Sequence, residues 1–321
     1  MNKEELQLKR KMHKRIIVML IGILILAAMI PLWASKFVLR LRSYELEVDW
    51  AGSVETCDHE KTGISDSDCL FCNEDGRIRI LQLTDLHNST FGKDNQRLIK
   101  MIQVQNPDLI FMTGDMVNQD EESTDIVVDL VRRLSEIAPV YYSYGNHEDV
   151  HAQSWGTDFP RIIAAAGAVV LERSYVDTEV KGLPVRIGGI YGYCLPDMES
   201  GEDFEEETLF LQEFQNTDRY KMLLCHMPVC WISNGSLDYW DIDLVFAGHA
   251  HGGQVVIPFL GGLYAPDQGL LPGKLQGVFD SEDGNGHLIL SSGLGSEGIV
   301  PRWNNLPEVL QVDLCAQVLS Q

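Results

Sequence analysis

The chain has 321 residues, 45% of them hydrophobic, which is enough for one large globular domain and an appendage. Its formal net charge is −22, from 25 basic and 47 acidic residues. The first 42 residues hold nine of the basic and two of the acidic residues, so the remainder holds 16 and 45, a net charge of −29. A domain this acidic repels nucleic-acid backbones, and we expect no nucleic-acid partner.

Residues 1–35 combine a basic tail with an uncharged apolar run over 16–34, which is about long enough to cross a bilayer as a helix. The basic flank predicts a cytoplasmic N-terminus. A cleaved signal peptide ending at Ala34 is the alternative, but Leu32 is large where such a site requires a small residue. We therefore expect a single-pass anchor in the cell membrane and an extracytoplasmic domain.

Residues 36–76 are predicted to be an acidic linker, which carries Cys57, Cys69 and Cys72 together with His59. Three thiolates and one imidazole could form a small zinc site. A disulfide or free thiols in a mobile segment are the simpler interpretation, and we favour it.

From residue 77 the chain alternates strand-like and helix-like stretches, and we assign residues 77–321 to one domain. The order of these stretches predicts a parallel portion of sheet with helices packed on it, followed by a half that is richer in strands. The predicted strands cover 77–83, 108–112, 140–144, 185–190, 221–225, 244–247, 287–290 and 309–314, and the predicted helices cover 94–105, 123–137 and 205–217.

Side chains that can bind metals follow five of these predicted strands. They are Asp85 and His87, Asp115, Asn146 and His147, His226, and His249 and His251. Any one of them alone would be read as an ordinary turn or surface residue. Five such loops, each placed where parallel sheets carry their functional residues, predict a hydrolytic site with two divalent metals.

The ordered motifs Asp-x-His, Gly-Asp, Gly-Asn-His-Glu, His and Gly-His-x-His resemble the calcineurin-like metallophosphoesterase superfamily over about residues 77–315. The resemblance implies an α/β fold of four layers, α-β-β-α, in which two mixed sheets pack face to face behind the N-terminal transmembrane helix. Within the superfamily the chain is most similar to the membrane-anchored or exported bacterial branch. The stretches that carry this second similarity are 248–254, 263–266, 268–270, 293–295 and 307–309.

The resemblance also implies a role for each motif residue. Asp115 would bridge two ions of Mn, Zn or Fe, whose shared water becomes a hydroxide that attacks phosphorus in line. His147 would protonate the leaving oxygen. The remaining ligands would be Asp85, His87 and His251 for the first metal, and Asn146, His226 and His249 for the second.

Two departures from the family pattern concern the acid and the substrate. Family members often place an Asp three residues after the bridging Asp to orient the catalytic His, and here that residue is Asn118. An Asn oxygen can still accept a hydrogen bond from the imidazole, so we assign Asn118 a catalytic role beside His147. The branch of protein Ser/Thr phosphatases continues with Arg-Gly where this chain has Gln119-Asp120, which argues against a phosphoprotein substrate.

We therefore predict a binuclear-metal phosphohydrolase that acts near the membrane surface on a phosphodiester, phosphomonoester or pyrophosphate bond. The substrate would be a phosphorylated small molecule or a lipid head group. One alternative is a pyrophosphatase for a UDP-linked diacylglucosamine, and another is a metal-stabilised binding module with weakened catalysis. Apolar residues within 252–280 could form a lip beside the metals, although packing over the sheet edge is the interpretation that we favour.

Overall fold

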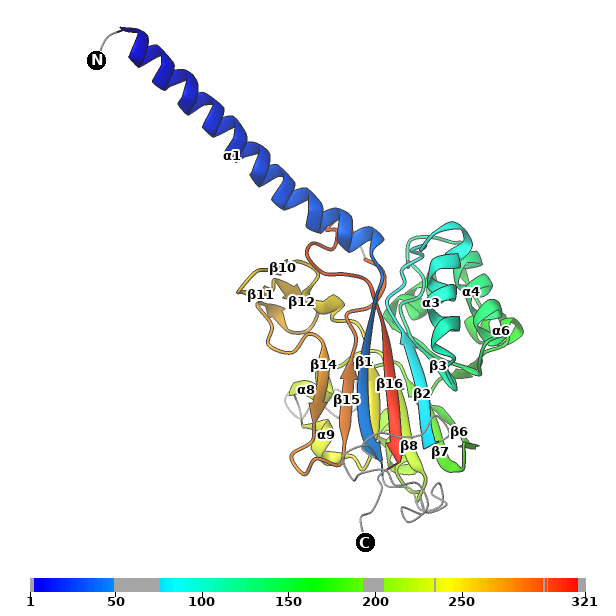
Figure 1. Ribbon diagram of the computed structural model, residues 1–321. Coiled ribbons are helices and arrows are strands. Elements are labelled where there is room, and N and C mark those ends of the chain that lie inside the picture. Colours follow the sequence, from blue (N-terminus) through cyan, green and yellow to red (C-terminus); the bar gives the residue numbers. More distant parts are fainter. Residues whose placement is uncertain are drawn as a thin grey trace, which may run out of the picture.

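Two six-stranded mixed sheets form the centre of the domain (Figure 1). The computed structural model describes residues 3–48, 76–192, 205–233, 235–296, 298 and 300–316. In spatial order, the first sheet contains β1 (Arg40–Val48), β16 (Glu308–Ala316), β2 (Arg77–Leu83), β3 (Leu109–Thr113), β4 (Val140–Ser143) and β5 (Val169–Leu171). The second contains β14 (Gly277–Asp280), β15 (His287–Leu290), β9 (Leu244–Ala247), β8 (Tyr220–Cys225), β7 (Leu183–Ile190) and β6 (Ser174–Val180).

Helices cover the outer face of each sheet, so the domain has four layers (Figure 1). The helices that alternate with strands of the first sheet are η2 (Lys93–Asn95), α3 (Gln96–Gln105), α4 (Asp125–Ser135), α5 (Asn146–Trp155) and α6 (Phe159–Ala166). Those of the second half are α7 (Glu205–Phe214), α8 (Val229–Ser233) and α9 (Ser236–Tyr239). The predicted α/β fold of two mixed sheets behind an apolar N-terminal helix is thereby confirmed.

The alternation of side chains along each strand builds the two kinds of core. In β2, Ile78 and Ile80 lie in the core between the sheets, whereas Leu81 and Leu83 lie in the core beneath the helices. Burial on both faces explains why this strand is a nearly continuous apolar run in the sequence.

The carboxyl ends of the parallel strands all lie at one edge of the two-sheet sandwich. Strands β2, β3 and β4 run parallel in the first sheet, and β7, β8, β9 and β15 run parallel in the second. Strand β16 is antiparallel to β2, with Leu310 opposite Gln82, and β1 is parallel to β16, with Arg40 opposite Glu308. The first residue of β1 therefore lies at the same edge as the last residues of β2.

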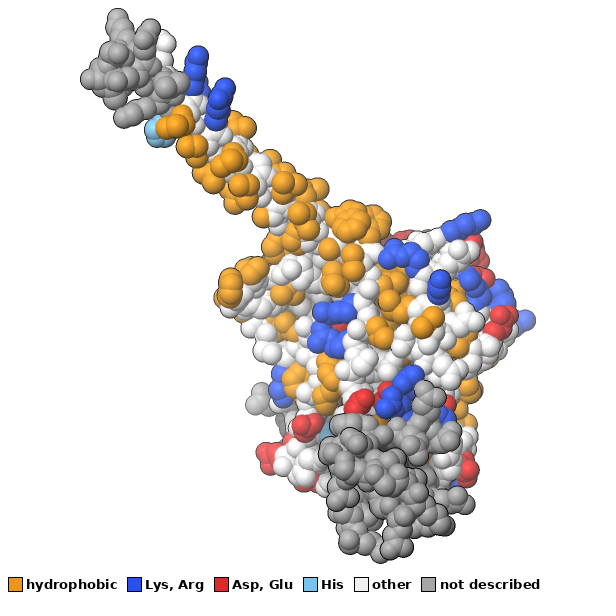
Figure 2. Space-filling model, in the orientation of Figure 1, with side chains coloured by type: hydrophobic (Ala, Val, Ile, Leu, Met, Phe, Trp, Pro, Cys, Tyr) orange, Lys and Arg blue, Asp and Glu red, His pale blue; other side chains and the backbone are white. Residues whose placement is uncertain are grey.

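One long helix, α1 (Lys3–Phe37), precedes this domain (Figure 1). Its segment Lys11–Phe37 is long and apolar enough to cross a membrane, with a mean hydropathy of 2.8, and its most apolar stretch is not buried against the domain. The same properties are typical of a signal sequence. Figure 2 shows the hydrophobic surface of this helix continuing onto the adjoining edge of the domain, with Lys and Arg near its N-terminal end.

The prediction that residues 36–76 form a linker is wrong for its first part. Strand β1 occupies Arg40–Val48 and pairs with β16 along its whole length, so only Val38 and Leu39 separate it from α1. The charged residues of β1 made this edge strand look like a linker in the sequence, although its Tyr44 and Leu46 pack against the core between the sheets. The predicted zinc or disulfide residues, Cys57, His59, Cys69 and Cys72, lie outside the described residues.

The segment that follows the two-histidine loop forms two small hairpins rather than a cover over the sheet edge. After η3 (His251–Gly253) come β10 (Val256–Ile257), β11 (Gly261–Gly262), β12 (Tyr264–Ala265) and β13 (Gly269–Leu270). Six large apolar side chains on these hairpins are exposed, contrary to the packing that we favoured. They are Phe259, Leu260, Leu263, Tyr264, Leu270 and Leu271, which we call the apolar rim.

Candidate metal centre

The loops after the parallel strands hold their functional residues in an uncommon backbone conformation. Asp85 and His87 after β2, Asp115 after β3, and His249 and His251 after β9 all have positive φ values, between 46° and 65°. For residues other than glycine this conformation costs free energy, and a cluster of such residues is typical of functional sites. Five of the seven predicted metal ligands share it.

Two glycines allow the loops after β3 and β4 to approach closely. A Cβ atom on Gly114 would lie 2.3 Å from the backbone nitrogen of Gly145, and a Cβ on Gly145 would lie 2.2 Å from Oδ1 of Asp115. Gly114 also has a φ of 88°. Only glycine at both positions lets the Asp115 carboxylate sit between the two loops.

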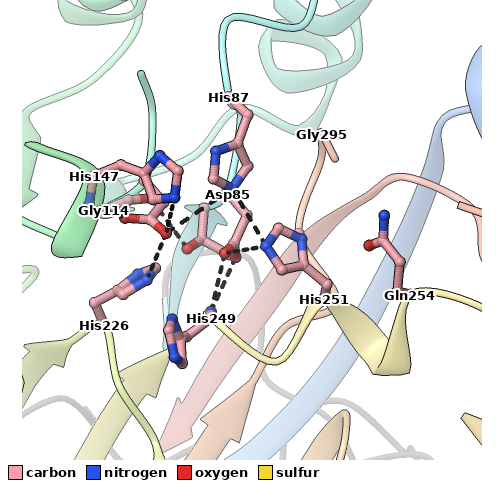
Figure 3. A network of polar contacts seen from close by, with 12 residues as sticks. Asp85, His87, Gly114, His147, His226, His249, His251, Gln254 and Gly295 are labelled. Carbon is pink, nitrogen blue, oxygen red and sulfur yellow. Dashed lines mark hydrogen bonds and ion pairs between the residues drawn. The ribbon is translucent and has the colours of Figure 1, made fainter. Parts of the chain in front are cut away.

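The first group of potential ligand atoms contains Asp85, His87 and His251, which lie within 4.8 Å of one another. Figure 3 shows these imidazoles arranged around the buried Asp85. The Nε2 atoms of His87 and His251 are 3.3 Å apart, and Nε2 of His251 is 3.5 Å from Oδ1 of Asp85. Burial lowers the pKa of His87 to about 3 and lowers that of His251 well below its usual range. Two neutral imidazoles and a carboxylate that converge in this way fit a divalent transition metal.

The second group contains Asp115, His226 and His249. The Nδ1 atom of His226 lies 2.7 Å from the Thr113 carbonyl oxygen, to which it donates its proton. Its Nε2 atom is therefore left facing Oδ2 of Asp115 at 3.1 Å. Burial lowers the pKa of His226, but the charges on Asp115 and Asp85 outweigh burial and raise the pKa to about 10. This position therefore attracts positive charge, which a metal ion can supply.

Asp115 belongs to the second group and also to a third group with His87 and His147, so its carboxylate adjoins His87 of the first group. Burial raises its pKa, but the neighbouring imidazoles, His226 above all, outweigh burial and hold the pKa well below its usual range. Its Oδ1 atom accepts a hydrogen bond of 2.8 Å from the backbone nitrogen of His147. An ionised carboxylate with one oxygen fixed in this way suits a bridging ligand.

Asn146 is the first residue of α5 and lies between Gly145 and His147, which both contact Asp115. Its Oδ1 atom is buried and has no hydrogen-bond partner among the described residues. A buried amide oxygen without a partner is costly unless it binds a ligand, and this oxygen can complete the second metal site without adding charge.

His147 lies at the same centre, with Nε2 4.0 Å from Oδ2 of Asp115. Its ring packs edge-on against that of His87, with 4.6 Å between the centroids. The backbone nitrogen of Gln119 donates to Nδ1 of His147 at 3.2 Å, so the proton of the neutral ring resides on Nε2.

The structure gives Nδ1 of His147 a different partner from the Asn118 oxygen that we expected. Nδ1 of His147 accepts a hydrogen bond, so it has no proton to donate to an oxygen. The Asn118 amide instead donates to Oε1 of Glu121 at 2.6 Å. The sequence could not show that the backbone N–H of Gln119 would contact Nδ1 of His147, where the Asp of other family members would contact it.

Glu148 fixes the loops after β3 and β4 relative to each other, a role that the motif alone did not predict. Its carboxylate accepts hydrogen bonds of 2.7–2.8 Å from the backbone nitrogens of Asp115, Met116 and Gly145 and from the hydroxyl of Tyr142. These four donors come from two neighbouring strand ends, so one buried side chain holds both ligand loops.

Two further residues escaped prediction because each is isolated in the sequence. Oδ2 of Asp267, in the turn between β12 and β13, lies 3.1 Å from Nε2 of His249. A proton held on this nitrogen leaves Nδ1 of His249 available for a metal. The buried guanidinium of Arg302 lies 3.3 Å from Nδ1 of His251 and donates to the carbonyl oxygens of Ser292 and Gly295.

Comparison with known proteins places the chain among phosphoesterase sequences. The family model described as "Calcineurin-like phosphoesterase" matches residues 78–253. The chain is 27% identical to the uncharacterized metallophosphoesterase YkuE of Bacillus subtilis over 72% of this chain and 77% of that protein. It is 28% identical to the phosphodiesterase YaeI of Escherichia coli over 74% of this chain and 82% of that protein. Among solved structures, TT1561 of Thermus thermophilus gives a TM-score of 0.44 at 14% identity, over 66% of this chain and 88% of that chain.

Proposed function

The chain belongs to the calcineurin-like phosphoesterase family, and on that premise we propose that its metal centre is binuclear and hydrolyses a phosphate ester. The observation that carries the proposal is the position of Asp115, which groups with His226 and His249 and also with His87 of the first group. A shared carboxylate is what two closely spaced metal ions require. Asp85, His87 and His251 would hold one ion, and His226, His249 and Asn146 would hold the other.

Bound divalent ions supply an activated water at neutral pH and neutralise the phosphate charge. The chain's own residues contribute a buried, pre-positioned cradle and a hydrogen-bond donor for the leaving oxygen. Water adds across the ester: its oxygen joins phosphorus, the bond from phosphorus to the ester oxygen breaks, and that oxygen takes a proton that the attacking water releases. We assign to the Nε2–H group of His147 the hydrogen bond that stabilises the leaving oxygen, because the Gln119 N–H occupies Nδ1 and leaves Nε2 facing Asp115.

We further propose that α1 remains attached as a membrane anchor with an extracytoplasmic domain. Lys and Arg residues cluster before the apolar run, which favours an N-terminus that stays in the cytoplasm. The contacts between the end of α1 and the domain also support an uncleaved helix. Ser35 is buried, and its hydroxyl accepts a hydrogen bond from the backbone nitrogen of Asn305.

The test uses the full-length chain in detergent, stripped with a chelator and reloaded with Mn, Zn or Fe(II). Bound metal is counted, and hydrolysis of a chromogenic phosphodiester is compared with that of its monoester. We expect two ions per chain and metal-dependent turnover. Asp115→Asn should lower both metal content and turnover, the latter by at least about 100-fold. One ion per chain, or full turnover in Asp115→Asn, would contradict the binuclear site.

A further inference from the structure

The metal loops and the end of the apolar helix lie at the same edge of the sandwich. Arg40, which two residues separate from α1, is paired with Glu308, and Leu310 is paired with Gln82, three residues before Asp85. Arg97 donates to the carbonyl oxygen of Phe37 at 2.8 Å and so ties α3 to the last residue of α1. A membrane that contains α1 would therefore face the loops that carry the metal ligands.

The apolar rim lies at this edge and exposes large side chains to the surroundings. Phe259 is fully exposed, and Leu270 retains 74% of its accessible surface. Residues 255–273 contain a single charged residue, Asp267, and its carboxylate contacts the imidazole of His249. A cluster of large exposed apolar side chains in a segment with so little charge is unusual for a face in contact with water and is typical of a protein or membrane contact.

Hydrogen bonds connect the hairpin of Phe259 to the apolar helix itself. The indole nitrogen of Trp303 donates to the carbonyl oxygen of Ala28 at 2.8 Å, and the Trp303 carbonyl accepts from Val256 in β10. The apolar run continues for six residues after Ala28, so this contact lies roughly 9 Å inside the end of the run along the helix axis. Half of a bilayer's hydrocarbon core is about 15 Å thick. If α1 spans a bilayer, this part of the domain enters the adjacent leaflet.

The rim is also coupled directly to the metal centre. Asp267, between β12 and β13, contacts the predicted ligand His249. The backbone of Gly253, at the end of the two-histidine loop, packs so closely on Gly262 of β11 that a Cβ there would lie 2.6 Å from its Cα atom. Both hairpins of the rim are thus fixed to the loop that carries His249 and His251.

A cavity of about 590 Å³ opens between the end of α1 and the metal loops. The helix contributes Leu32 and Phe37 as apolar walls and Lys36 as a cation. The opposite wall includes Asn88, the neighbour of His87, and Arg302, which contacts His251. The cavity has the size of a small-ligand site and is lined by both apolar and polar side chains.

We propose that the substrate is a phosphate ester carried by a membrane lipid, reached while the apolar rim lies in the leaflet at the C-terminal end of α1. This inference rests on the proposed function and names the substrate class of the same site. Water's oxygen joins the lipid phosphorus, one ester bond to phosphorus breaks, and the leaving oxygen is protonated. A membrane-embedded substrate explains three features together: the shared edge, the uncharged rim and the cavity beside α1.

The first test compares lipid esters with water-soluble esters that have the same phosphate linkage. Full-length protein is reconstituted in phosphatidylcholine vesicles containing a minority of phosphatidic acid or phosphatidylglycerol, and glycerol phosphate and a chromogenic diester serve as soluble esters. We expect faster turnover of a lipid ester than of its soluble counterpart. The double variant Phe259→Asp with Leu260→Asp should lower lipid turnover at least about tenfold and leave soluble turnover within about twofold.

The matched control is Val104→Asp, which also replaces an exposed apolar side chain, here with 70% of its surface accessible. Val104 lies near Arg77, at the start of β2 and therefore at the opposite edge of the sandwich. This variant should leave lipid turnover unchanged. Equal or better turnover of the soluble esters, or unaltered lipid turnover in the rim variant, would overturn the proposal.

A second test does not depend on activity. Phe259→Trp and Val104→Trp are reconstituted separately in vesicles that contain brominated phospholipids, which quench tryptophan within the hydrocarbon region. We expect the fluorescence of the added tryptophan to be quenched only in Phe259→Trp. Equal quenching of the added tryptophan in the two variants would refute insertion of the rim. If no ester of any kind is hydrolysed after metal loading, the proposed function fails as well. Turnover of soluble esters alone refutes only the lipid substrate.

Discussion

The carboxylate of Asp267 lies 3.1 Å from Nε2 of His249, although 18 residues separate the two in the chain. The pair joins a small hairpin to a metal loop and fixes which imidazole nitrogen carries the proton. Residues that hold a ligand imidazole in this way affect metal affinity without touching the metal.

Replacing Asp267 should therefore weaken the second metal site. We expect Asp267→Asn to lower affinity for the second ion by about 10–100-fold, measured by titrating metal into the stripped full-length chain. The matched control is Asp280→Asn, because Asp280 pairs with Nδ1 of His287 at 2.8 Å in an exposed position. Equal metal affinity in both variants would show that the Asp267 contact has no influence on the ligand.

Glu148 should be indispensable for the stability of the metal loops. In Glu148→Gln an amide nitrogen replaces one carboxylate oxygen and faces two N–H or O–H donors. Loss of two buried hydrogen bonds to a charged group should lower the free energy of unfolding by about 3–6 kcal/mol, measured by urea titration in detergent. Tyr142→Phe removes one donor and should cost less, roughly 1.5–3 kcal/mol. The reverse order of the two variants would contradict this role.

The close approach of two loops can be tested at Gly114. An added Cβ there would lie 2.3 Å from the Gly145 nitrogen, so Gly114→Ala should push Asp115 out of place and reduce bound metal. Gly156 also has a positive φ, of 68°, but a Cβ there meets nothing within 4 Å. Gly156→Ala should therefore cost only the backbone strain, roughly 1–2 kcal/mol, and keep its metals. Full metal content in Gly114→Ala would show that the loops can separate without consequence.

The junction of β1 with β16 should respond to acid. Burial raises the pKa of Glu308, but the Ser292 N–H, Arg42 and Arg40 outweigh burial and hold the pKa below its ordinary value of 4.5. Oε2 of Glu308 lies 2.5 Å from Nη2 of Arg40 and 3.0 Å from Nε of Arg42. A lowered folded-state pKa means that the carboxylate stabilises the fold above the unfolded pKa, and that this stabilisation disappears as the pH falls through the folded pKa.

We expect Glu308→Gln to lower the free energy of unfolding by about 2–3 kcal/mol at neutral pH. The difference from the unmodified chain should shrink once the pH falls below about 4.5. Glu122→Gln, at an exposed position, is the matched control and should change little at any pH. A Glu308→Gln effect that is constant across this range would exclude ionisation of Glu308 as its cause.

The buried strands could be predicted from the sequence, whereas the edge strand and the short hairpins could not. Buried strands such as β2 and β9 show as apolar runs, and the loops after them show as polar residues at regular places, so both could be predicted. Strand β1 lies at a sheet edge, and its alternation of Tyr44, Leu46 and Val48 with charged residues was mistaken for a linker. The hairpins after residue 255 are too short to produce any periodicity.

The inner residues of the site were more predictable than those that hold them in place. Asp85, His87 and the other motif residues occur in ordered groups, and the structure brings six of the seven predicted ligands together in two groups. Asp267 and Arg302 belong to no motif, and their partners are distant in the chain. Only the folded chain could show these contacts, as it showed that the backbone nitrogen of Gln119 donates to Nδ1 of His147.

The two-residue junction between α1 and β1 has a kinetic consequence. A domain on a long flexible tether can move away from the membrane surface. Here only Val38 and Leu39 connect α1 to β1, so the domain has to stay next to the end of the helix. With α1 in a bilayer, the domain would explore only the plane of that bilayer. Encounters would then be governed by two-dimensional diffusion. The turnover rate would depend on the mole fraction of substrate within the lipid surface and would remain unchanged when the vesicle suspension is diluted.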